Sequence, residues 1–96
     1  DVARISQRLQ TIREALRRDY GVTGLAVVEG ETTLSGCVPG VVNILVRFHS
    51  PPDIMAFFGL EGIISGQCGQ PINLAPAMAP TDRDGEGQTR LVWLWA

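Results

Sequence analysis

The sequence contains few of the residues that bind transition metals or form disulfides. It has two cysteines, Cys37 and Cys68, and a single histidine, His49. A structural zinc site needs four cysteine or histidine ligands, usually in closely spaced pairs, so this chain is not expected to hold one. We expect two reduced thiols, as in a cytosolic protein, and a disulfide between them is the alternative.

Long apolar segments are also missing. The longest strongly apolar runs are VVNILV and IMAFF, far short of the ~18 residues that cross a bilayer. No positively charged head precedes an apolar core and a small-residue cleavage site, so we expect no secretory signal. These absences predict a cytoplasmic protein with no membrane contact.

Lysine is absent, and all eight basic residues are arginines. The phosphate-binding motif Gly-x-x-x-x-Gly-Lys-[Ser/Thr] is therefore excluded. The formal net charge of −2 argues against direct, charge-driven binding of nucleic acid. Five of the arginines lie in the first 18 positions, so this segment alone is basic. Its arginine face is either a solvated outer surface or a site for an acidic partner or RNA.

The composition and length of the chain indicate one folded domain over residues 1–96. Hydrophobic residues make up 45% of the chain and charged residues 19%, which is a globular balance. A chain of this length forms one domain with a single small core.

Residues 2–19 are predicted to form an amphipathic helix. Its apolar positions recur at steps of three and four and form one stripe. They are Val2, Ile5, Leu9, Ile12 and Leu16. Asp1 is expected to cap the start of the helix, and Gly21 is expected to end it. Glu14 precedes Arg18 by four positions and is expected to form an ion pair with it.

The remaining pattern predicts four strands and a second helix, and hence a small α+β domain with helices packed against a mixed or antiparallel sheet. The strands are expected at residues 24–29, 41–48, 71–76 and 89–95. The run 41–48 is almost wholly apolar, as in a central strand covered on both faces. The helix is expected over 54–66, with Asp53 as its N-cap. Its expected core set is Ile54, Phe57, Phe58, Leu60, Ile63 and Ile64.

The C-terminal strand is rich in tryptophan. Strict alternation places Leu91, Trp93 and Trp95 on one face and Val92 and Leu94 on the other. A strand that is apolar on both faces needs two covers. One is the core of the domain, and the other is either more of that core or a partner.

The order and spacing of short motifs over residues 4–78 are typical of one family. The motifs are YGV at 20–22, LAVVEG at 25–30, VVNILVRF at 41–48, SPPD at 50–53 and GQPINLAP at 69–76. This pattern resembles the minimal nucleotidyltransferases of the DNA polymerase β superfamily. The resemblance implies a nucleotidyltransferase-like fold, to which the strand at 89–95 is an addition.

The chemical residues of that family are mostly replaced in this chain. Its Gly-Ser signature falls on Glu29 and Gly30, its Asp-x-Asp pair on Val41 and Asn43, and its third aspartate on Asn73. Magnesium needs hard, anionic oxygen ligands, and valine supplies none, while asparagine supplies only a neutral one. We therefore expect no metal site, no catalytic residue and no cofactor, with Mg²⁺ and ATP expected only if the relic cleft still binds them.

Two kinds of site are predicted. A relic nucleotide cleft would comprise Gly30, Thr32, Thr33, Val41, Asn43 and Asn73. The two asparagines either bind a nucleotide there or are bonded to neighbouring backbone. A partner interface would use the basic helix and the C-terminal strand, through Arg4, Arg8, Leu91, Trp93 and Trp95.

The resemblance implies three alternative functions. The first is an inactive nucleotidyltransferase-like domain that binds a protein partner or a second copy of itself. In the family, such domains serve as antitoxins of all-helical HEPN-type ribonucleases. The second is a sensor that binds a nucleotide without reacting, and the third is an active, metal-dependent transferase with relocated ligands.

Overall fold

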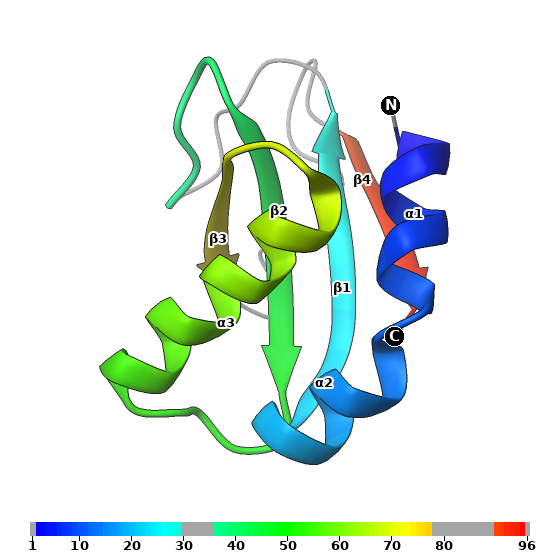
Figure 1. Ribbon diagram of the computed structural model, residues 1–96. Coiled ribbons are helices and arrows are strands. Elements are labelled where there is room, and N and C mark those ends of the chain that lie inside the picture. The colour runs from blue at the N-terminus through cyan, green and yellow to red at the C-terminus, as the bar shows by residue number, and fades with distance from the viewer. Residues whose placement is uncertain (1, 30–35, 78–89, 96) are drawn as a thin grey trace.

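A computed structural model describes residues 2–29, 36–77 and 90–95 and shows three helices packed against a four-stranded sheet (Figure 1). The expectation of a small α+β domain with a mixed sheet is confirmed. In chain order the elements are α1 (Val2–Gln10), α2 (Arg13–Tyr20), β1 (Val22–Glu29), β2 (Val42–Phe48), α3 (Ile54–Cys68), β3 (Ile72–Pro76) and β4 (Arg90–Trp95).

The sheet has the strand order β3-β2-β1-β4. Strand β1 is antiparallel to both β2 and β4, whereas β2 and β3 are parallel and are connected by α3. Ile44, Leu45 and Val46 of β2 are buried, although successive residues point to opposite faces. The prediction of a strand covered on both faces is therefore confirmed.

The expected single helix over 2–19 is two helices in the structure. The break lies at Thr11, whose hydroxyl donates a hydrogen bond of 2.6 Å to the Arg8 carbonyl. Side-chain bonds of this kind compete with the helical ladder. The expected pair between Glu14 and Arg18 is also wrong, because Glu14 pairs with Arg17 and Arg18 pairs with Asp19. Gly21 ends α2 as expected, with φ of 71° and its N–H bonded to the Arg17 carbonyl.

The main core lies between the three helices and one face of the sheet (Figure 1). Its helical residues are Ile5, Leu9, Leu16, Leu60 and Ile64. A second, smaller cluster lies on the opposite face and contains Ala26, Leu45, Ala75 and Leu91.

A β-bulge near the end of β4 overturns the expected alternation of its side chains. Leu25 pairs with Trp95 but Ala26 pairs with Trp93, so Leu94 is the extra residue. Trp95 consequently belongs to the main core, whereas Leu91 and Trp93 pack in the cluster on the opposite face. The prediction that Leu91, Trp93 and Trp95 share one face is wrong for this reason.

Helix α3 begins where the sequence predicted and extends two residues further. Asp53 caps it by accepting a hydrogen bond of 2.8 Å from the Ala56 N–H. At the other end, the Gly69 N–H bonds to the carbonyls of Ser65 and Gly66. Both ends of this helix are therefore capped by neighbouring residues of the chain.

Half of the expected core set of α3 is wrong. Leu60 and Ile64 are buried, and Phe57 is partly buried, but Ile54, Phe58 and Ile63 are exposed. An almost wholly apolar helix carries no amphipathic pattern that selects its inner face. Its orientation is instead fixed by contacts with the sheet, including the Glu61 carboxylate, which accepts a hydrogen bond of 2.9 Å from the Leu74 N–H of β3.

Candidate functional site

Three of the residues predicted for the nucleotide cleft lie together. Asn43 of β2 and Asn73 of β3 are register partners, and Val41 immediately precedes β2. The Asn73 Nδ2 donates a hydrogen bond of 3.0 Å to the Asn43 Oδ1. Gly30, Thr32 and Thr33, the other predicted members, lie outside the described residues.

The amide of Asn43 is fully used in bonds within the domain. Its Oδ1 also accepts from the Val38 N–H at 2.9 Å, and its Nδ2 donates to the carbonyls of Val38 at 2.8 Å and Val41 at 3.2 Å. An asparagine side chain has two donors and one oxygen with two lone pairs, so this inventory is complete. The side chain is only 3% exposed, and it holds the segment before β2 against the sheet.

Asn73 extends the same network to Gly36. Its Nδ2 donates a second bond, of 2.7 Å, to the Gly36 carbonyl. Gly36 has φ of 87°, and a Cβ there would lie 3.1 Å from the Ala75 Cβ, so the segment approaches β3 closely. Of the two interpretations of the asparagines, these contacts support the one in which they brace the backbone.

The described residues show no metal centre at this position. They contain no group of three or more histidine, cysteine, aspartate or glutamate side chains that could hold an ion. Cys37 and Cys68 are both free, and burial raises the pKa of each thiol above its usual value. Both are therefore protonated thiols at neutral pH.

The predicted interface residues of β4 are mostly inside the domain. Leu91 and Trp95 are buried, and the Arg13 guanidinium lies over the Trp95 ring, 5.3 Å from its centroid. Trp93 is partly buried, and the Arg47 guanidinium lies 4.3 Å from its ring centroid. Each tryptophan thus has an intramolecular cation–π partner. Their use as a partner surface stays a prediction.

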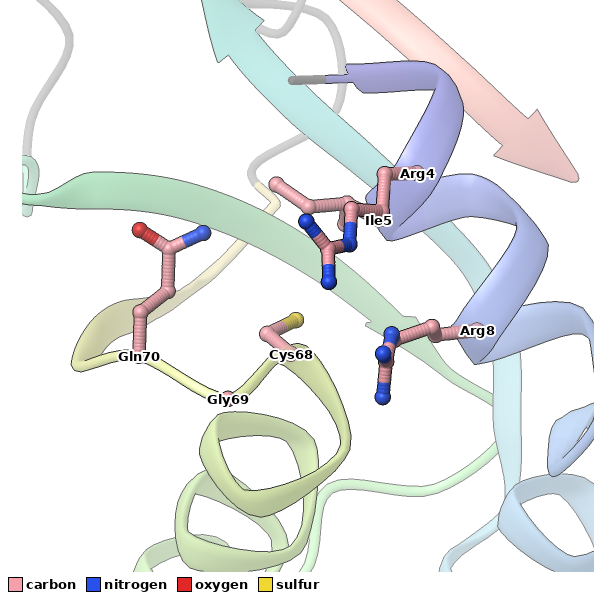
Figure 2. Close-up of a pocket in the computed structure, with 6 residues that line it drawn as sticks. All are labelled: Arg4, Ile5, Arg8, Cys68, Gly69 and Gln70. Carbon is pink, nitrogen blue, oxygen red and sulfur yellow. The ribbon is translucent and has the colours of Figure 1, made fainter.

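Arg4 and Arg8, the other predicted interface residues, are exposed and lie one turn apart on α1. They line a pocket of about 350 Å³ between α1 and the end of α3 (Figure 2). Its remaining lining residues are Ile5, Cys68, Gly69 and Gln70. The structure therefore separates these arginines from Trp93, which packs on the other face of the sheet.

The exposed side of α3 is a surface that the sequence did not predict. We define the outer face of α3 as Ile54, Met55, Phe58, Gly62, Ile63 and Gly66. The exposed fractions of its large side chains are 68% for Ile54, 78% for Met55, 58% for Phe58 and 41% for Ile63. The only charged residue of the helix, Glu61, is bonded to β3.

An apolar groove adjoins the start of this face. It has a volume of about 520 Å³ and includes Phe48, Pro52, Ile54 and Phe57 among its lining residues. Ile54 belongs to both the groove and the outer face, so the two form one continuous apolar surface. The signal available in the sequence was the lack of charge from Ile54 to Cys68, where Glu61 is the sole exception.

Comparison with protein-family models, curated proteins and solved structures finds no match for this chain. The resemblance to minimal nucleotidyltransferases therefore remains a prediction from the sequence. Within the described segments, no helix is both long enough and apolar enough to cross a membrane.

Proposed function

We propose that this domain is a protein-binding module that docks its partner on the outer face of α3. The observation that carries the proposal is the exposure of four large apolar side chains on one uncharged helical face. Large exposed apolar patches are typical of protein interaction sites.

The composition of the face suits such a role. Burying Met55 and Phe58 in an interface removes two large side chains from water. Each fully buried side chain of this kind contributes about 1.5–3 kcal/mol of favourable free energy. Methionine is flexible and adapts to irregular partner surfaces. Gly62 and Gly66 carry no side chain, and no other atom occupies the space above them, so a partner backbone can approach α3 closely there.

A helical partner fits this face best. Side-chain ridges of one helix pack into the grooves of another at interaxial distances of 8–10 Å in general, and small residues allow the closest approach. The family resemblance suggests a specific class, because an antitoxin-like domain would mask an all-helical HEPN-type ribonuclease by contact alone. The bonded amide of Asn43 and the valine at position 41 support a role without nucleotidyl transfer.

Substitution of Phe58 by aspartate is expected to weaken partner binding at least 100-fold, because it removes an aromatic anchor and places a carboxylate in an apolar interface. Since the side chain is exposed, the fold should be unaffected. The measurement is co-expression with the product of each neighbouring gene, followed by calorimetric titration of the complex that forms.

The matched control is Gln7→Asp, which adds the same charge at an exposed position of α1. We expect this variant to bind as the wild type does. The proposal fails if no neighbouring product binds, or if Phe58→Asp and Gln7→Asp bind equally well.

A further inference from the structure

Two arginines differ from the others in the described part of the chain. Arg17, Arg18 and Arg90 each pair with a carboxylate, on Glu14, Asp19 and Glu29 respectively. Arg13 and Arg47 each lie over a tryptophan ring. Arg4 and Arg8 have no carboxylate or ring partner among the described residues, and both line the same pocket.

Figure 2 shows how the two side chains are placed. Their guanidinium groups extend from α1 into the space in front of the last turn of α3, beside the Cys68 thiol. The Gln70 side chain lies on the far side of the same space, and buried Ile5 contributes apolar lining. Two like charges at positions i and i+4 repel each other, and a bound anion would remove that repulsion.

Capping of α3 does not explain these arginines. The Gly69 N–H already bonds to the carbonyls of Ser65 and Gly66, and the Ser65 hydroxyl donates to the Gln70 carbonyl. The C-terminus of a helix carries roughly −0.5 elementary charge, which opposes an anion. Two full positive charges exceed that partial charge, so the pocket remains a net attractor of anions.

We propose that this pocket binds the phosphate group of a small anionic molecule, held by Arg4 and Arg8 with the Gln70 amide as a further donor. The guanidinium fork matches the oxygen geometry of phosphate, and two forks match a group with about two negative charges near pH 7. Cys68 does not oppose the anion, because burial raises the pKa of its thiol and keeps it neutral, although nearby Arg8 acts in the opposite direction. The pocket shares no residue with the outer face of α3.

The test is a titration of ¹⁵N-labelled protein with inorganic phosphate and, in a second arm, with ribose 5-phosphate. Sodium chloride of matched ionic strength gives the background in each case. We expect saturable shifts of the residue 4, 8, 69 and 70 signals with a dissociation constant of millimolar or lower. Tighter binding of ribose 5-phosphate would identify an organic phosphate ester as the ligand, and equal or tighter binding of inorganic phosphate would identify the free ion.

Arg8→Gln should weaken binding at least tenfold, and Arg4→Gln with Arg8→Gln should abolish it. The control is Arg18→Gln, which makes the same change in net charge on the neighbouring helix and should leave binding unchanged. The proposal is overturned if no saturable shift appears by 10 mM of either compound, if sodium chloride reproduces the shifts, or if binding survives in the double variant.

Discussion

Replacing Asn43 by alanine is expected to lower the free energy of unfolding by about 3 kcal/mol. The change removes both hydrogen bonds to Val38 and the bond from Asn73 Nδ2, and leaves the partly buried N–H and carbonyl of Val38 without these partners. A domain of this size has a total stability of about 5–15 kcal/mol, so the loss is a large fraction. The measurement is urea unfolding followed by tryptophan fluorescence.

Two further variants make this result specific. Asn73→Ala removes fewer bonds from a less buried side chain, and we expect a loss of about 1 kcal/mol. Asn43→Asp introduces a carboxylate of nearly the same shape and places it against the carbonyls of Val38 and Val41, which accept hydrogen bonds from the amide in the wild type. It should therefore destabilise more than Asn73→Ala. A loss below about 0.5 kcal/mol for Asn43→Ala would show that the amide does not brace the fold.

Leu60→Ala is expected to cost about 3–5 kcal/mol, because the side chain is fully buried between α3 and the sheet and its removal leaves a cavity. Phe58→Ala removes a larger side chain from the same helix but should change stability by no more than about 0.5 kcal/mol, since Phe58 is exposed. Both values come from urea unfolding of the purified variants.

This pair of variants tests the orientation of α3 directly. The sequence predicted both side chains in the core, whereas the structure places only Leu60 there. Equal destabilisation by the two substitutions would mean that Phe58 is buried, and the outer face of α3 would not exist as a surface.

Much of the fold could be predicted from local signals. The central strand was evident from its apolar run, and Asp53 and Gly21 marked helix ends through chemistry that is local to each position. Several predictions failed, and two of the errors have local causes that the apolar pattern does not reveal. The Thr11 hydroxyl broke a helix that the apolar stripe alone predicted to continue, and the bulge at Leu94 reversed the face of the last tryptophan.

The candidate site was harder to predict for a related reason. An apolar helix exposes whichever side its neighbours leave uncovered, and the bond from Leu74 to Glu61, between residues distant in sequence, helps to set that side. Asn43 and Asn73 meet because β2 and β3 pair in parallel, and the resemblance had placed both residues in one predicted cleft. Their amides bond to the backbone because the segment before β2 passes close to them. The spacing of residues in the sequence does not reveal the path of that segment.

The central claim, that the outer face of α3 is the docking surface, is tested most directly by methyl NMR of the complex. Isoleucine and methionine methyl groups would be labelled in this chain and observed as the unlabelled partner is added. We predict that the signals of Ile54, Met55 and Ile63 shift or broaden, while those of buried Ile5 and Ile44 change little. Changes centred on Ile5, with Ile54, Met55 and Ile63 unaffected, would contradict the claim and place the interface on α1.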